Sequence, residues 1–176
     1  MNARFLLLAA ASVLSVSACT QPSAPSQAST KPAPVSDHDA VGAIRAAGMS
    51  MGKDSSVQVQ PLRDRAIDGY LDSARAAEKT GDYARAAASA NEALKLAPDA
   101  PDIVQFLAEL EIERGNWQAA EQFAIKSFTL GPKVGNLCAR NWQTVVEARK
   151  ALNDAATVAS AKQRLKECRV PPRVRM

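Results

Sequence analysis

Histidine is nearly absent from this chain of 176 residues, which has one histidine, three cysteines and 5% aromatic residues. A zinc site needs about four ligands, and none gather around His38, which stands in a polar stretch between Asp37 and Asp39. A single histidine also limits the Ser-His-Asp triad and its relatives. We therefore predict no metal site and no cofactor, and we expect His38 to be a solvated loop residue.

Signatures of other catalytic chemistry are missing too. The sequence contains no Gly-Lys-Ser or Gly-Lys-Thr phosphate loop and no Gly-x-Ser-x-Gly elbow. Glu109 and Glu113 are spaced i, i+4, which is typical of an exposed helix rather than of a glycosidase pair. Trp117 and Trp142 fit a core better than a carbohydrate platform. These patterns predict a protein that is not an enzyme and has no catalytic residues.

The N-terminus carries the first positive signal. A charged start at residues 1–4 precedes an apolar run over residues 5–16, which is shorter than the roughly 20 residues of a membrane span. Small residues before Cys19 are typical of a secretory signal peptide. The Val-Ser-Ala-Cys sequence resembles the lipobox of bacterial lipoproteins, which implies that residues 1–18 are removed and that Cys19 carries covalent lipid. The alternatives are an ordinary signal peptide or a membrane span with a stray cysteine.

The next segments separate this anchor from the folded part. Residues 19–36 are rich in proline, serine and alanine without an apolar period, which predicts a disordered tether. Such a coil spans roughly 20–25 Å at about 5–6 Å × √n. Residues 37–61 predict an irregular lead-in, with a short helix over 39–49 that glycine weakens and a brief extended segment over 57–59.

Residues 62–170 predict a helical domain that repeats itself at an interval of 34 residues. Residues 67–100 align with 101–134, and the paired positions are Gly81 with Gly115, Tyr83 with Trp117, Ala86 with Ala120, and Pro98 with Pro132. Glycine suits a left-handed turn after a first helix, and proline ends the second helix. Asp82 and Asn116 can each cap that second helix through a side-chain oxygen.

This pattern resembles the tetratricopeptide repeat family, whose period is 34 residues. The resemblance implies an all-α fold of antiparallel helical hairpins stacked as a short solenoid. A third, degenerate hairpin follows over residues 136–168, with Asn153-Asp154 where the Gly-Asp turn stood. We expect it to be a capping unit, because terminal repeats are usually atypical. Residues 171–176 form a basic tail.

Two cysteines lie at opposite ends of the third hairpin. Cys138 is near the start of its first helix, and Cys168 is at the end of its second. An antiparallel hairpin brings these ends together, and export permits oxidation. We therefore expect a disulfide that closes a loop of about 30 residues. Two separate buried thiols are the alternative.

In the tetratricopeptide family, the first helices of successive repeats line a concave groove. The repeat register implies a lining of Asp68, Leu71, Arg75, Glu78, Asp102, Gln105, Glu109 and Ile112, with Arg140, Gln143 and Glu147 from the third hairpin. The chaperone-binding members have a Lys/Asn clamp where Leu71 and Arg75 stand, so that activity is not implied. The alternative for all these positions is a solvated helix face.

Charge is distributed unevenly along the chain. Residues 63–132 carry 8 Lys or Arg and 12 Asp or Glu, whereas residues 133–176 carry 10 and 3. A basic end can attract anionic surfaces or form a solvated face. Because Thr20 is not the Asp that retains enteric lipoproteins at the inner membrane, the resemblance implies an outer-membrane lipoprotein facing the periplasm, where nucleic acid is not a partner.

Two functions are compatible with these patterns. The family resemblance implies a non-catalytic scaffold or assembly factor of the cell envelope that binds a protein or peptide through its groove. The alternative is a structural lipoprotein whose basic C-terminal hairpin contacts anionic cell-wall polymer or lipid.

Overall fold

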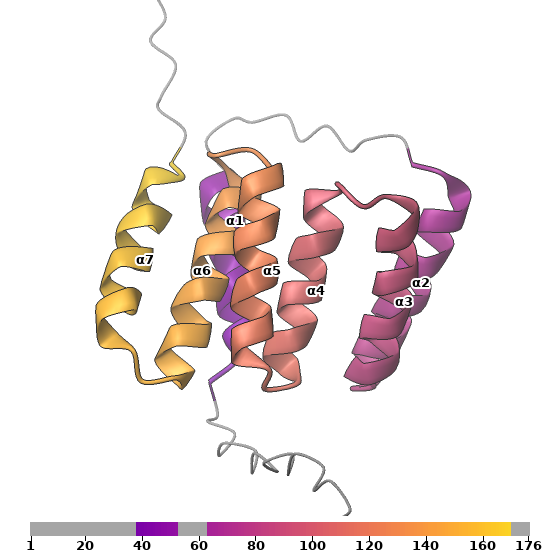
Figure 1. The fold of residues 1–176 in the computed structure, drawn as a ribbon, viewed down its shortest axis with the longest axis horizontal. Helices are drawn as coiled ribbons and strands as arrows, with labels where there is room; N and C mark the ends of the chain where they lie inside the picture. The colour runs from indigo at the N-terminus through magenta and orange to yellow at the C-terminus, as the bar shows by residue number, and fades with distance from the viewer. Residues whose placement is uncertain (1–37, 53–62, 170–176) are drawn as a thin grey trace, which may run out of the picture. The chain divides into compact units, whose positions relative to one another are not determined.

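The computed structural model describes residues 38–52 and 63–169, which form seven helices and no strand (Figure 1). The helices are α1 (Ala40–Gly52), α2 (Arg65–Lys79), α3 (Tyr83–Leu96), α4 (Pro101–Glu113), α5 (Trp117–Leu130), α6 (Asn136–Ala151) and α7 (Ala155–Glu167). The predicted signal peptide, tether, extended segment and basic tail lie outside the described residues. None of the described helices is long and apolar enough to cross a membrane.

The repeat predicts the turns as well as the helices. Gly81 lies in the turn of the first hairpin and has a φ of 74°, and Gly115 lies in the turn of the second and has a φ of 72°. Both angles are in the left-handed region that favours glycine. Asn153 adopts φ 58° at the corresponding place between α6 and α7. Asparagine tolerates this conformation better than most side chains, so the third hairpin keeps the turn without glycine.

Of the two predicted helix caps, the one by Asp82 forms and the one by Asn116 does not. The Asp82 side chain accepts a hydrogen bond from the Arg85 backbone N–H at 3.1 Å, and Asp154 accepts one from Thr157 at 3.0 Å. The expected cap by Asn116 is wrong, because its side chain makes no cap hydrogen bond. Its amide donates instead to the Glu111 carboxylate at 2.6 Å, a charged and therefore stronger acceptor.

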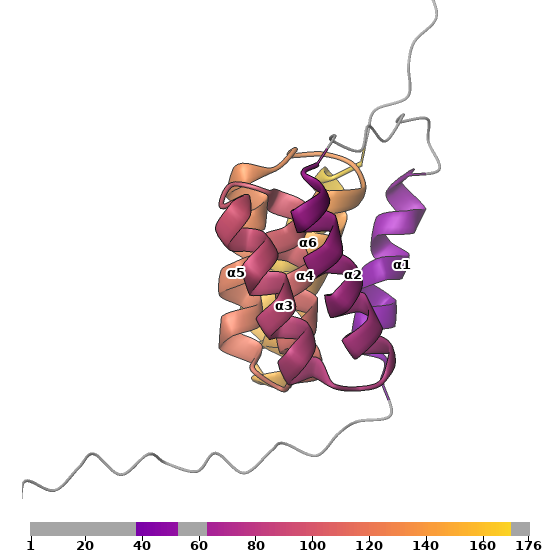
Figure 2. The ribbon, with the colours of Figure 1, turned by 90° about the vertical axis from the view of Figure 1, so that its right-hand side faces the viewer.

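Helices adjacent in sequence pack as antiparallel pairs, α2 with α3, α4 with α5 and α6 with α7. The first helices of the pairs meet one another where α4 contacts α6. Helix α1 packs on α6 and α4, on the side turned away from α5 (Figure 2). We call this side of α2, α4 and α6 the inner face.

Alanine allows the paired helices to approach closely. Ala74 of α2, Ala86 of α3 and Ala120 of α5 have no exposed surface. The repeated aromatics Tyr83 and Trp117 are partly buried against these clusters, which agrees with a packing role. Small residues at helix crossings and one large aromatic per repeat therefore determine the spacing of the helices.

The expected disulfide joins Cys138 and Cys168, whose Cα atoms are 5.6 Å apart. Both residues are buried beside Phe128, Trp142 and Leu165. The Gly135 backbone N–H donates to the Cys168 carbonyl at 2.7 Å, which also ties the start of α6 to the end of α7. The terminal hairpin is thus closed by a covalent bond as well as by packing.

Candidate functional site

Helix α1 covers the part of the inner face formed by α4 and α6. Val41 and Ile44 of α1 are 4% and 0% exposed and pack with Ile112 of α4 and Ala148 of α6. A Cβ atom placed on Gly48 would lie 2.7 Å from Cγ of Arg140, so the glycine permits a close crossing of α1 and α6. The short helix predicted over residues 39–49 is present as α1, and it packs on parts of the chain that are distant in sequence.

The side chains beneath α1 are mostly polar. We call them the α1-covered face, and they are Gln105, Glu109, Ile112, Arg140, Thr144, Glu147 and Ala148. Buried polar groups need hydrogen-bond partners, and these side chains largely bond one another.

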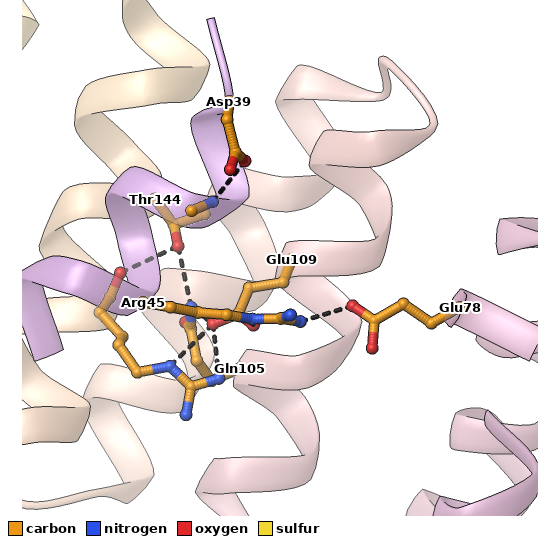
Figure 3. A network of polar contacts seen from close by, with 8 residues as sticks. Asp39, Arg45, Glu78, Gln105, Glu109 and Thr144 are labelled. Atoms are coloured by element: carbon orange, nitrogen blue, oxygen red, sulfur yellow. Dashed lines mark hydrogen bonds and ion pairs between the residues drawn. The ribbon is translucent and has the colours of Figure 1, made fainter. Parts of the chain in front are cut away.

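Glu109 is the centre of this network (Figure 3). Its carboxylate is 0% exposed, with one oxygen 3.0 Å from Nε of Arg45 and the other 2.5 and 2.8 Å from Nη2 and Nε of Arg140. Gln105 donates to Glu109 at 3.2 Å and to the Thr144 hydroxyl at 2.8 Å. Two guanidinium groups thus compensate a carboxylate that burial alone would destabilise.

Arg45 links three helices. Its Nη2 lies 2.5 Å from the Glu78 carboxylate of α2, while its Nε bonds Glu109 of α4. Desolvation opposes its charge, but the Glu109 and Glu78 carboxylates outweigh that effect and raise the pKa of Arg45 above its ordinary value. Arg45 therefore remains a cation and holds α1 to both sides of the inner face.

The N-terminal end of α1 has its own contacts. The His38 ring lies 3.1 Å from the Glu147 carboxylate, so this loop histidine, predicted to be solvated, is half exposed and bonded to the α1-covered face. Gln143 donates to the same carboxylate at 2.6 Å. Asp39 accepts a hydrogen bond from the Gly42 backbone N–H at 2.6 Å and stabilises the first turn of α1.

The remaining residues of the predicted groove lie in different environments. Leu71 is 2% exposed and belongs to the core, so it lines no open surface. Asp102 is partly buried and pairs with Arg63. Asp68 and Arg75 are exposed on the same side of α2 as Glu78, whose bond to Arg45 shows that this side is turned toward α1. The open part of the predicted lining is therefore on α2.

An acidic cluster lies beside Arg45. Desolvation and the Asp39 and Glu78 carboxylates raise the pKa of Glu113, although Arg45 and a hydrogen bond from Tyr83 oppose the shift. Glu113 in turn raises the pKa of Tyr83. The carboxylates of Asp39, Glu78 and Glu113 thus lie near a single arginine, Arg45, and make this region of the inner face acidic.

We predict that Glu113→Gln stabilises the protein at neutral pH. A carboxyl pKa raised in the folded state means that stability falls as pH rises above the ordinary value of 4.5 and stays lower above the folded-state pKa. The gain should therefore be present at neutral pH and shrink toward zero as pH falls below 4.5. Urea unfolding at both pH values measures it. Glu92→Gln, which removes an exposed carboxylate paired with Lys95, is the control and should give no gain.

Within residues 38–52 and 63–169, no group of three or more His, Cys, Asp or Glu side chains could hold a metal ion. The polar network of the α1-covered face is instead arranged as hydrogen bonds and ion pairs between helices. Such an arrangement can receive the polar and cationic side chains of a helix laid across it.

Comparison with known proteins agrees with this architecture. The family model for the tetratricopeptide repeat matches residues 77–126. The solved globular C-terminal domain of P. aeruginosa LpoP is similar, with 30% identity, a TM-score of 0.56 and coverage of 60% of this chain and 99% of that one. No curated protein sequence matches the chain. The chain belongs to the tetratricopeptide repeat family, whose stacked helical hairpins form extended surfaces for binding other proteins.

Proposed function

We propose that the protein is a non-catalytic protein-binding scaffold of the bacterial cell envelope, held at the outer membrane by lipid on Cys19. The observation that carries the binding role is the inner face, where polar and charged groups of α2, α4 and α6 converge on one helix-sized surface. Export is supported by the leader sequence and by a buried disulfide, a bond typical of oxidising compartments.

The partner contacts the open inner side of α2 first. Asp68 and Arg75 are exposed there, and Glu78 is only partly covered. These side chains offer both signs of charge, which suits a peptide or helix with charged side chains of its own. Helix α1 borders this exposed side of α2, so a bound partner would lie against Arg45 and the acidic cluster.

In-cell photocrosslinking tests the binding role. A photoreactive amino acid at Arg75 samples the inner face, and one at the exposed Lys126 samples α5, which is not part of that face. The proposal expects a discrete protein adduct from the first position and none, or a different one, from the second. Equal labelling of the same proteins from both positions would argue against the inner face as the binding surface.

Cys19→Ala tests the anchor. The lipobox resemblance implies that the thiol of Cys19 is the site of lipidation, so its loss should release the protein from membranes or leave the leader uncleaved. Membrane fractionation and intact mass of the mature N-terminus measure both effects. Ser17→Ala, which retains the cysteine, is the control. A wild-type protein found wholly in the soluble periplasm without acyl mass would contradict the anchor.

A second candidate function rests on the charge of α7. Lys162, Lys166 and Arg169 are exposed at this end, whereas Arg164 is paired with Glu167. These cations would bind anionic cell-wall polymer or lipid headgroups. A pull-down at low and high salt separates the two functions, because loss of all capture at high salt favours the charge-driven one.

A further inference from the structure

We propose that the α1-covered face is a binding site for a partner helix with the chemistry of α1, and that α1 is its exchangeable resident. The partner helix carries small residues on one face, an aliphatic side chain like Ile44, and next to it an arginine like Arg45. This inference rests on the proposed protein-binding function and names the part of the inner face that recognises the partner.

The face beneath α1 has the composition of a surface. Gln105, Glu109, Thr144 and Glu147 are 0–4% exposed with α1 in place. The apolar residues that pack with α1 are Ile112, Ala120, Trp117 and Ala148, and Met51 of α1 also packs on the cluster around the disulfide. When α1 leaves, water can replace most of the lost hydrogen bonds, so the polar part of this face can exist without α1.

The buried charge remains compensated when α1 leaves. Arg140 bonds Glu109 at 2.5 and 2.8 Å from within the α1-covered face itself. The bonds that depart with α1 are that of His38 to Glu147 and those of Arg45 to Glu109 and Glu78. The two carboxylates then present a pair of acceptors to an incoming guanidinium, whose several N–H donors suit such an arrangement.

Helix α1 has a low intrinsic helix propensity and lies over a buried polar atom that has no partner among the described residues. Gly42, Gly48 and Gly52 reduce its helix propensity, and Val41 and Ile44 are its fully buried aliphatic residues. Below it, Oε1 of Gln105 is buried without a hydrogen bond from the described chain. A partner helix that places a donor over Gln105 would therefore bind this face better than α1 does.

The test uses the full chain with its disulfide intact and a labelled synthetic peptide of residues 38–52. Ile44→Asp in the chain should undock α1, and Met49→Asp, on the exposed side of the same helix, is the matched control. If the face is free of α1 less than about a tenth of the time, the apparent affinity of the peptide for the chain is at least tenfold weaker than its affinity for the free face. We therefore expect at least tenfold tighter peptide binding to Ile44→Asp than to Met49→Asp, and weaker binding of a peptide whose Arg45 is replaced by alanine.

Hydrogen exchange of the wild-type chain provides the measurement that does not depend on a variant. The amides of α1 should exchange as one group well before those of α4 and α6. Exchange of α1 only together with α6, or equal peptide binding by the two variants, would overturn the proposal. Arg45→Ala replaces Ile44→Asp if the latter loses its helical circular dichroism. Neither readout needs the cellular partner. Absence of a crosslink at Arg75 in cells would therefore reject the proposed function without changing the outcome of the peptide-binding and exchange measurements.

Discussion

Loss of the Cys138–Cys168 disulfide is expected to lower the free energy of unfolding by about 3–4 kcal/mol in the chain-entropy model. The bond closes a loop with a sequence separation of 30, and its removal frees the unfolded chain to explore more conformations. The third hairpin depends on it particularly, because α7 packs on α6 and has no further repeat beyond it in the described chain. Terminal repeats with few neighbours open first.

Chemical denaturation with and without reductant measures this effect. Cys138→Ser and Cys168→Ser should each behave like the double mutant, since either removes the same bond. Hydrogen exchange or proteolysis should locate the loss of protection beyond Gly135. If mass spectrometry of the unreduced wild-type protein finds both cysteines alkylated, the bond does not form in solution and the two residues act as small buried side chains.

A tryptophan at either repeated alanine should also be strongly destabilising. Ala86 and Ala120 are 0% exposed where paired helices cross, and the core has no room for an indole. Overpacking of this kind forces off-rotamer side chains and backbone shifts, and we expect a loss of about 1–3 kcal/mol or more for each variant.

Thermal or urea unfolding measures both variants against Ala88→Trp. Ala88 lies on the same helix as Ala86 but is exposed, so its replacement changes composition and helix propensity without crowding a crossing. The control should lie within about 0.5 kcal/mol of the wild type. Unchanged melting of both Ala86→Trp and Ala120→Trp would mean that the helices do not cross closely at these positions.

The repeat region could be predicted because its determinants are local. A glycine turn, an aromatic two residues later and a proline at the end of the second helix recur at one interval, and each residue type has a conformational reason for its place. The same logic extended to the third hairpin, where Asn153 supplies the left-handed turn. It failed at Asn116, because a neighbouring carboxylate competes for the side-chain amide.

The role of α1 could not be predicted from the same kind of pattern. Its glycines weaken the helix signal, and its partners are far away in sequence, with a separation of 64 positions from Arg45 to Glu109 and of 109 from His38 to Glu147. The repeat register placed Gln105, Glu109 and Arg140 on one lining, and in the structure their side chains bond one another. The register contained no information about what lies over them. Val41, Ile44, Gly48 and Met51 follow a helical spacing, which was the available signal for a packed face.

The most direct test of the account measures crosslinking next to the α1-covered face in cells. A photoreactive residue at Gln143, which borders Glu147, is introduced into the wild-type, Ile44→Asp and Met49→Asp chains. The account predicts one discrete protein adduct whose yield is clearly higher in Ile44→Asp than in the other two chains, because α1 and the partner compete for one surface. Equal yields from all three chains, with folded protein at equal levels, would contradict it.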